Sequence, residues 1–360
     1  MAHFTTLLRR NYCKIDLSTF AIQADSIFDV LYDASNDWLW FLAHTRSTNL
    51  DELVGFCRTS QQESRVLSFP KGLRPASPMI IDESGTMLLA YCKQHVDPGS
   101  GLNSWKLCVF PLARRRFVDA VCISETELNR GNALFWNELV LSLTNDFNGL
   151  GYDYRDNTWF DVVYDPTLRM VTTVRPPKMR ITFSYTGRLS FRIDRALERF
   201  IVLCENELKI FCMRTNTMLH ATPLSILKPY KQARTHSIHK FCLDLHGRIY
   251  LADDDEMAIF ILSPECKYLA AAKLTCCTHS ITFDPNRGEL LVLGVDKKLV
   301  LFLANSLVPN TYVWTPERHR FAPPGIRASV LQLLCARETR TDSMVHQLSN
   351  ELLYSVIVLL

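Results

Sequence analysis

The feature that most constrains this chain is a repeated unit in which an aspartate-led turn precedes a short apolar run. These turns are Asp33-Ala-Ser-Asn36, Asp82-Glu-Ser-Gly85, Asp194-Arg-Ala-Leu197, Asp244-Leu-His-Gly247 and Asp284-Pro-Asn-Arg-Gly288. An aspartate side chain can accept a hydrogen bond from the backbone two residues later, and glycine permits the positive φ of tight turns. The turns recur roughly every 40 to 50 residues, which is a period typical of repeat architectures.

Two short apolar runs follow most of these turns. The first runs are Trp38–Leu42, Met87–Tyr91, Phe200–Leu203, Arg248–Leu251 and Leu290–Leu293. The second runs are Trp105–Phe110, Leu208–Cys212, Met257–Ile261 and Leu299–Leu303. Runs of about four to six residues are typical of strands rather than helices. A unit of roughly four strands in 40 to 50 residues predicts the blade of a β-propeller.

We therefore predict a mainly β protein, a six- or seven-bladed β-propeller with a small C-terminal α-helical segment. The number of blades stays open because the repeat is blurred between residues 100 and 190, where Asn129 and Asp165 are arguable anchors. The predicted organisation is an N-terminal segment 1–20 that would close the propeller, a propeller over 21–322, and a helical segment over 326–360. A pair of β-sandwiches is the alternative architecture.

The clearest unit, Phe241-Cys-Leu-Asp-Leu-His-Gly-Arg-Ile-Tyr-Leu-Ala-Asp253, resembles the NHL pattern of turn, strand and closing aspartate. Over residues 20–320 the chain resembles a diverged propeller of the NHL or WD-repeat kind. This resemblance implies that partners bind the loops of the two faces and the mouth of the central channel. The richest stretches of that kind are Thr45–Glu52, Lys93–Asn103, Arg114–Arg116 and Thr222–His239.

Composition excludes several classes of protein. With 48% apolar and 21% charged residues, the 360-residue chain has ample material for a core and is not mainly disordered. A net charge of +3 does not produce a strong electrostatic field around the whole protein, so we expect neither nucleic acid nor a membrane as partner. Many of the twelve cysteines stand inside apolar runs, where a thiol behaves as a small hydrophobe. We expect a reduced compartment, namely the cytoplasm and also the nucleus.

The hydrophobic period changes after Pro323-Pro324-Gly325. Apolar residues then recur at helical spacing, at Ile326, Val330, Leu331, Leu334 and Cys335, and again at Leu348, Leu352 and Val356. This pattern predicts two amphipathic helices joined by a polar link at 338–343. Such a small helical pair cannot bury its apolar faces alone, so it must pack on the propeller or on another protein.

These residues resemble a SOCS box, a motif in which a Leu-x-x-x-Cys helix docks into elongin C and a second part engages a cullin. The resemblance implies that the elongin C-binding residues are Leu331, Leu334 and Cys335. It implies that the cullin-facing half consists of Leu348, Leu352 and Val356. Ser349 replaces the proline usual in that second half, so the elongin-facing half carries the closer match.

The function that this resemblance implies is that of a substrate-recognition subunit of a cullin–RING E3 ubiquitin ligase. The propeller would hold an unknown target protein, while the C-terminal helices would bind elongins B and C and through them a cullin. One alternative is a propeller scaffold unrelated to ubiquitin, whose C-terminal helices cover a blade. A second is an F-box-like adaptor, because Leu348–Ile357 resembles the opening of that motif. A third is a calcium-dependent propeller hydrolase.

No motif for catalysis stands out, and we expect neither an enzyme nor a resident cofactor or metal. Four residues that could bind zinc lie near one another in the sequence, namely Cys266, Cys276, Cys277 and His279. Adjacent cysteines diverge on a strand, which favours buried strand residues instead. The acidic run Asp253–Glu256 could bind calcium, but we favour a solvated hairpin tip. The basic run Arg114–Arg116 could bind phosphate or an acidic peptide, but we favour a surface loop.

Overall fold

A computed structural model describes residues 12–16, 25–45, 50–60, 62–69, 73–81, 87–95, 103–112, 121–122, 139–143, 149–153, 158–165, 170–174, 189–194, 197–204, 207–215, 217–230, 238–296, 298–303 and 324–339. Over these ranges the protein is mainly β-structure, with an α-helix near the C-terminal end. The prediction of a mainly β protein with a short C-terminal helical segment is confirmed.

The described strands form six antiparallel sheets of four strands each, and five sheets use strands that are consecutive along the chain. The first contains β2 Ser26–Asp33, β3 Trp38–Thr45, β4 Leu50–Cys57 and β5 Gln62–Ser68. The second contains β6 Leu73–Ile81, β7 Met87–His95, β8 Asn103–Pro111 and β9 Val121–Cys122. The third contains β10 Leu139–Leu143, β11 Gly149–Asp153, β12 Thr158–Asp165 and β13 Met170–Val174.

The remaining sheets are made in the same way, with one exception. The fourth contains β14 Leu189–Asp194, β15 Arg199–Cys204, β16 Glu207–Cys212 and β17 Met218–Pro223. The fifth contains β18 Ile238–Leu243, β19 Ile249–Asp253, β20 Ala258–Leu262 and β21 Tyr268–Lys273. The sixth contains β22 Thr278–Asp284, β23 Glu289–Gly294, β24 Lys298–Leu303 and, from the other end of the chain, β1 Tyr12–Asp16. β1 pairs antiparallel with β24, with Tyr12 opposite Phe302.

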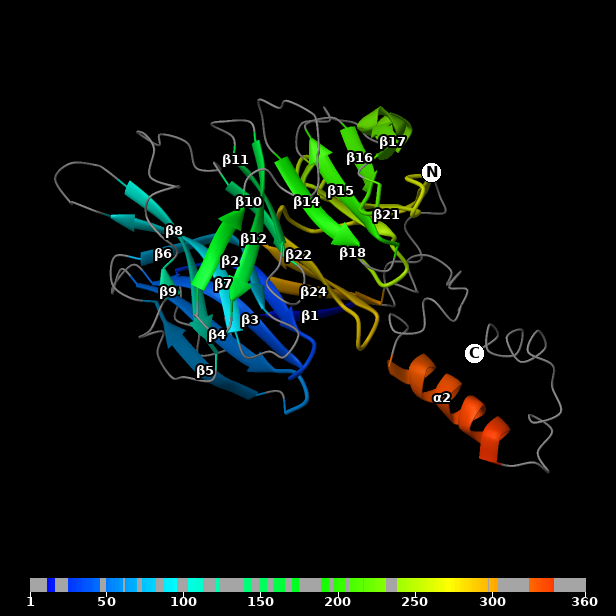
Figure 1. Ribbon diagram of the computed structural model, residues 1–360, viewed down its shortest axis with the longest axis horizontal. Helices are drawn as coiled ribbons and strands as arrows, with labels where there is room; N and C mark the ends of the chain where they lie inside the picture. The colour runs from blue at the N-terminus through cyan, green and yellow to red at the C-terminus, as the bar shows by residue number, and fades with distance from the viewer. Residues whose placement is uncertain are drawn as a thin grey trace.

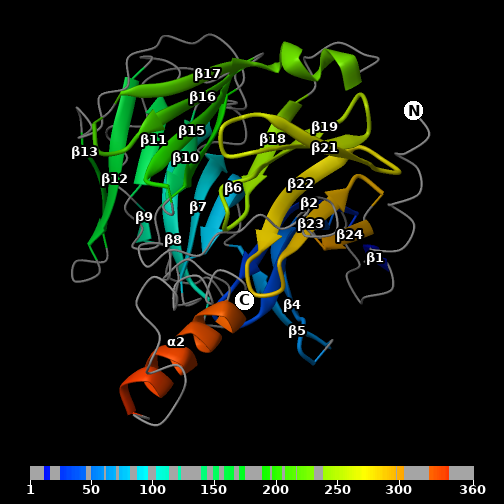
Figure 2. The same cartoon turned by 90° about the vertical axis from the view of Figure 1, so that its right-hand side faces the viewer.

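The first strand of each sheet contacts the first strands of its neighbours. The contacts run from β2 to β6, β10, β14, β18 and β22 in turn, and β22 contacts β2. Figures 1 and 2 show the sheets side by side in chain order, with the helix α2, Pro324–Thr339, extending away from them.

The apolar runs of the sequence are the second and third strands of these sheets. β15, β19 and β20 are buried along their whole length, because neighbouring sheets cover both of their faces. A strand covered on both faces is apolar throughout, whereas a half-exposed strand alternates. The anchor at Asp165 is wrong, since this residue ends the third strand of its sheet, and Asn129 lies outside the described residues.

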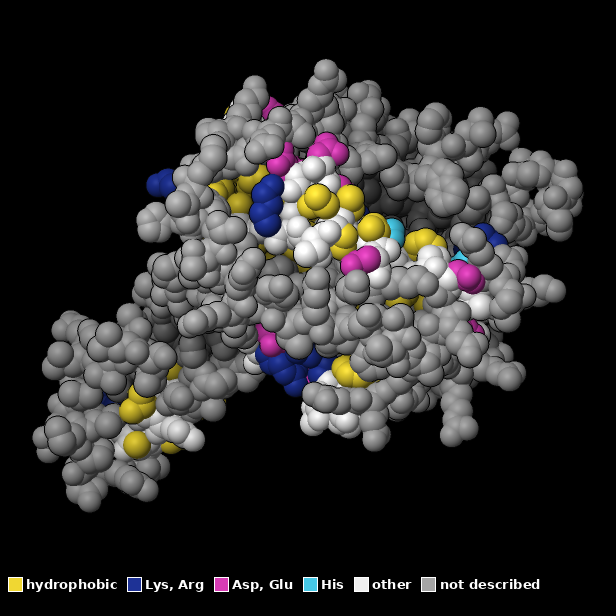
Figure 3. Space-filling view, turned by 180° about the vertical axis from the view of Figure 1, so that it is seen from behind, with side chains coloured by type: hydrophobic (Ala, Val, Ile, Leu, Met, Phe, Trp, Pro, Cys, Tyr) yellow, Lys and Arg dark blue, Asp and Glu magenta, His cyan; other side chains and the backbone are white. Residues whose placement is uncertain are grey.

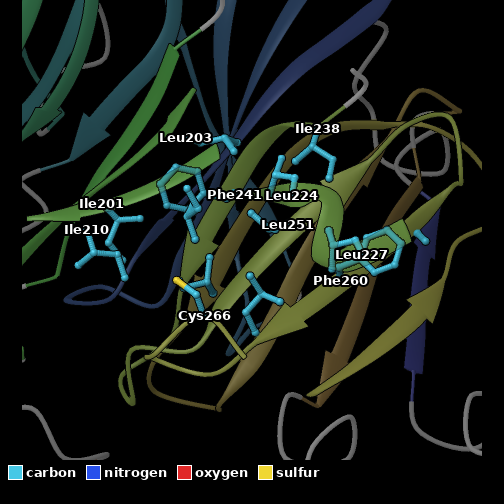
Figure 4. Packing of buried hydrophobic residues seen from close by; sticks show 14 residues of the cluster. Ile201, Leu203, Ile210, Leu224, Leu227, Ile238, Phe241, Leu251, Phe260 and Cys266 are labelled. Atoms are coloured by element: carbon cyan, nitrogen blue, oxygen red, sulfur yellow. The ribbon is translucent and has the colours of Figure 1, made fainter. Parts of the chain in front are cut away.

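Side chains of adjacent sheets form the core. Between the fourth and fifth sheets, Ile201 and Ile210 belong to a cluster with Phe241 and Phe260 (Figure 4). The 3-10 helix η2, Leu224–Tyr230, follows β17 and adds Leu224 and Leu227 to the same cluster, both fully buried. This helix therefore closes the gap between two sheets.

The aspartate-led turns join first and second strands and lie at one end of the sheets, here named the aspartate end. The Asp244 Oδ1 atom accepts from the backbone N–H of His246 at 2.8 Å, and Asp284 Oδ1 accepts from that of Asn286 at 2.8 Å. Asp33 Oδ1 accepts from the N–H of Ser35 at 3.0 Å. The predicted aspartate turns are confirmed at these three positions, as the side-chain chemistry requires.

Arginines at the aspartate end connect neighbouring sheets. Arg199 of the fourth sheet donates from Nη2 to the carbonyl of Gly247 in the fifth, at 2.7 Å. Arg58, which follows β4, forms ion pairs with Asp284 and Glu289 of the sixth sheet. In the opposite direction, Arg287 Nη2 donates to Asp37 Oδ2 at 2.6 Å. The first and sixth sheets are thus joined by ion pairs in both directions.

Candidate functional site

The helix α2 contains the residues that the sequence singled out for elongin C. It begins at Pro324, a residue well suited to a first helical turn because its missing N–H has no partner to lose there. Leu331, Leu334 and Cys335 all lie within the helix.

Burial divides the surface of α2 into two sides. Val330 is fully buried, whereas the neighbouring Leu331 is 52% exposed. Cys335 is also exposed, and Leu334 is half-buried. Because residues four apart lie one above the other, Leu331 and Cys335 form an exposed stripe one turn long. Seen from behind, hydrophobic side chains lie on the surface of α2 (Figure 3). The cullin-facing residues Leu348, Leu352 and Val356 lie outside the described residues.

The cysteines that were candidate zinc ligands contact different groups. The Cys276 Sγ atom lies 3.2 Å from Asp296 Oδ1, while the Cys277 Sγ atom contacts the carbonyl oxygen of Asp254 at 3.6 Å. Cys266 is buried in the core between the fourth and fifth sheets. Within the described ranges, no three His, Cys, Asp or Glu side chains come together as a metal site would require.

The acidic run Asp253–Glu256 forms the turn between β19 and β20, as predicted, but it is not solvated throughout. Asp253 is fully buried and accepts from the N–H groups of Asp255 and Glu256, both at 3.1 Å. Glu256 is 7% exposed and lies 3.3 Å from the Lys273 ammonium group. These two carboxylates therefore stabilise the turn and its neighbouring strand. Arg114–Arg116 lie outside the described residues.

A group of polar side chains on the first strands was not anticipated from the sequence. Asp29 of β2 is buried and accepts from the Ser280 hydroxyl of β22. Arg192 of β14 places its guanidinium over the ring of Phe241, 5.5 Å from the centroid. Burial raises the pKa of the Cys242 thiol, so this group stays protonated at neutral pH and is a poor nucleophile.

The sequence analysis also missed three exposed apolar side chains at the end of the sheets opposite to the aspartate end. They are Phe28 at the start of β2, Met257 in the turn before β20, and Val295 in the turn after β23. Met257 and Val295 stand in turns and Phe28 lies at a register shift within β2, so no periodic pattern marks them. Only their positions in neighbouring sheets bring them together.

None of the helices within the described ranges has the length and apolar character needed to cross a bilayer. Comparison of the sequence with models of protein families gave no match, and a search of curated proteins gave none either. The function must therefore be inferred from the residues themselves.

Proposed function

We propose that this protein is a substrate-recognition subunit of a cullin–RING E3 ubiquitin ligase, with α2 as the segment that binds elongin C. The observation that carries the proposal is the exposed stripe of Leu331 and Cys335, which lies beside the buried Val330 on α2. An apolar stripe at this spacing is what a helix-binding groove recognises.

We further propose that the six sheets are the blades of a six-bladed propeller, closed by β1. The cyclic contacts among the first strands support this, as does the pairing of β1 with β24. The ion pairs from Arg58 and Arg287 add to the junction between the first and sixth sheets. Such a body is a rigid frame whose loops can hold a target protein.

In this proposal the chain contributes proximity rather than chemistry. Leu331 would fill an apolar pocket of the groove, and the small thiol side chain of Cys335 would permit close approach of the two proteins. Holding a target beside the ubiquitin-transfer machinery converts a bimolecular encounter into an effectively intramolecular one.

Co-purification of the full chain with elongins B and C tests the proposal. A stable complex is expected, and Leu331→Ala combined with Cys335→Phe should weaken it at least tenfold, by removing an apolar anchor and adding bulk. Gln332→Ala is the matched control, because Gln332 is exposed on the same helix but outside the stripe. A full chain that ignores both elongins, or a double variant that binds as tightly as the parent, would refute the proposal.

The burial of Val330 favours a second candidate function, that of an interaction scaffold in which α2 packs within the protein and binds no elongin. This candidate predicts that a chain ending at Arg327 melts at a clearly lower temperature than the full chain. The ligase proposal predicts that the same truncation removes elongin binding and changes the melting temperature little. Melting curves and elongin binding of the two chains separate these candidates.

A further inference from the structure

Three exposed apolar side chains form a surface that the function of α2 does not use. Phe28 is 43% exposed, Met257 41% and Val295 47%. They come from the first, fifth and sixth sheets, and we call them, together with His44 and His279, the Phe28 patch. A cluster of exposed apolar groups on a folded protein commonly marks an interaction site.

Ring contacts and backbone hydrogen bonds connect these residues into one surface. The ring of Phe28 lies 6.3 Å from that of His279 and 6.4 Å from that of His44, measured between centroids. The segment before His279 bonds to the backbone of Met257 and Val295. There, Leu274 N–H donates to the carbonyl of Met257 at 2.6 Å, and Val295 N–H donates to that of Cys277 at 3.0 Å.

The same contacts hold the backbone of the patch in place. Met257 has φ +44, a conformation fixed here by the turn that begins at the buried Asp253. Thr278 N–H donates to Asp254 Oδ1 at 2.8 Å, which ties the fifth sheet to the sixth. A surface ordered before a partner arrives loses little conformational entropy on binding.

Among the residues whose side chains the structure describes, the charged groups around the patch are predominantly acidic. Among the described residues they include six carboxylates, of Asp25, Asp51, Asp254, Asp255, Glu256 and Asp296, and two ammonium groups, of Lys240 and Lys273. Both lysines lie within 4 Å of a carboxylate, Lys240 at 3.8 Å from Asp254 and Lys273 at 3.3 Å from Glu256. The side chains of Asp25, Asp255 and Asp296 are exposed.

His279 adds no cationic character to the patch at neutral pH. Burial, followed by the neighbouring Lys240 ammonium, lowers the pKa of His279, so its imidazole is neutral. The other histidine, His44, has its Nδ1 atom 2.8 Å from Asp51 Oδ1. On the face shown in Figure 3, hydrophobic side chains lie next to acidic and histidine side chains.

We propose that the Phe28 patch binds a segment of a partner protein in which an apolar side chain is flanked by lysine or arginine. The apolar residue would pack on Phe28, Met257 and Val295, and the flanking cations would face Asp25, Asp255 and Asp296. Nucleic acid and anionic lipid present phosphates, which these carboxylates repel, so a protein segment is the complementary occupant. This inference rests on the proposed function only in treating the sheets as the recognition part, and it does not depend on α2.

Fluorescence anisotropy with labelled nonapeptides tests this inference on the full chain. The probe set carries leucine, phenylalanine or methionine at the centre with lysine or arginine on both sides. One matched set replaces the cations by glutamate, and another replaces the apolar residue by serine. We expect the first set to contain peptides that bind at least tenfold more tightly than both matched counterparts, with binding that weakens as salt is added. Equal binding of the glutamate set, or no binding of any peptide, would overturn the inference.

Variants locate the binding on the molecule. Phe28→Ala with Val295→Ser, and separately Asp255→Lys with Asp296→Lys, should each weaken peptide binding at least tenfold. Met218→Ala is the control, since Met218 is 55% exposed on β17 but lies outside the patch, and it should bind as the parent does. A loss in Met218→Ala equal to that of the patch variants would contradict the assignment.

The α2 variant separates this inference from the ligase proposal. Leu331→Ala with Cys335→Phe should leave peptide binding unchanged while it removes the elongins. Peptide binding without elongin binding would refute the ligase proposal alone, and the reverse result would refute the patch alone.

Discussion

Aspartates at the two ends of the sheets differ in burial and in role. At the aspartate end, Asp244 and Asp284 are buried and receive several donors each, and arginines connect one sheet to the next. At the opposite end, Asp255 and Asp296 are exposed beside the apolar Phe28 patch. A buried carboxylate stabilises a fold only when its donors are in place, whereas an exposed one is accessible to solvent and adds negative charge to the surface. One end therefore holds the sheets together, and the other offers a surface for binding.

The largest expected effect comes from removing a buried carboxylate at the aspartate end. The Asp244 side chain binds Arg248 and, at 3.0 Å, the hydroxyl of Tyr250. Asp244→Ala leaves the guanidinium buried without its counter-charge, so we expect a loss of about 3 to 5 kcal/mol in the free energy of unfolding. Urea denaturation measures this loss. Asp255→Ala, at the opposite end, is the control and should change the value by less than about 0.5 kcal/mol; equal losses would contradict the comparison.

Two glycines at the aspartate end separate the cost of backbone strain from that of overpacking. Both have positive φ, but only Gly247 has other atoms close to the position of a Cβ. Gly247 has φ +74, and a Cβ there would lie 2.7 Å from Leu197 and 2.8 Å from Arg199. Gly288 has φ +65 and nothing within 4 Å of such a Cβ. Gly288→Ala should cost about 1 kcal/mol from backbone strain, and Gly247→Ala roughly 2 to 3 kcal/mol, since overpacking is added. Equal denaturation midpoints for the two variants would show that contacts between sheets at Gly247 do not matter.

Substitution of Arg58 tests whether the junction of the first and sixth sheets depends on the ion pairs of this residue. Arg58→Ala removes one ion pair from Asp284 and one from Glu289, and we expect a loss of about 2 kcal/mol in the free energy of unfolding. Arg214 pairs with Glu198 within one sheet and is 75% exposed, so Arg214→Ala should leave the unfolding curve unchanged. The expectation fails if both arginine variants unfold at the same urea concentration.

The pH dependence of stability gives a smaller effect at the same junction. A hydrogen bond from Arg287, stronger than the opposing effect of burial, lowers the pKa of Asp37 to about 2. Because the folded pKa lies below the ordinary value, Asp37 contributes stability above about pH 4 and loses it as the pH falls toward 2. Asp37→Asn should therefore flatten the decline of stability in this window, as followed by urea denaturation at several pH values. If the free energy of unfolding of the variant depends on pH as that of the parent does, the pKa of Asp37 does not change on unfolding.

The smallest effect is expected at the Phe28 patch. Phe28→Ala and Val295→Ser should each change the free energy of unfolding by no more than about 0.5 kcal/mol, since both side chains are already largely in water. Thermal and urea unfolding measure this directly. A loss near that of Asp244→Ala would place the patch in the core of the fold rather than on a binding surface.

Much of the secondary structure could be predicted from local patterns. The turns at Asp33, Asp244 and Asp284 were anticipated because an aspartate bonds to the backbone within its own turn. The helix after Pro323 was anticipated from its spacing of apolar residues. The anchor at Asp165 failed because this residue ends the third strand of its sheet rather than the first.

The candidate sites were predicted less completely. Leu331 and Cys335 were identified by spacing along one helix, but the spacing could not tell which side of α2 is exposed. Phe28 and Val295 gave no signal, since an apolar residue at the end of a strand or in a turn is as compatible with the core as with the surface. Asp29 and Arg192 gave none either, because their neighbours come from other sheets.

Local sequence specifies the features that depend on a few successive residues: aspartate turns, apolar strands and the start of the C-terminal helix. The packing of the sheets adds that β1 joins the sheet of β24, that Arg58 reaches Asp284 across 226 positions, and that exposed residues of three sheets lie at one end of the molecule. The physical reason is the range of the interactions. A turn closes with donors in its own segment, whereas a junction or a patch exists only after the sheets have packed against one another.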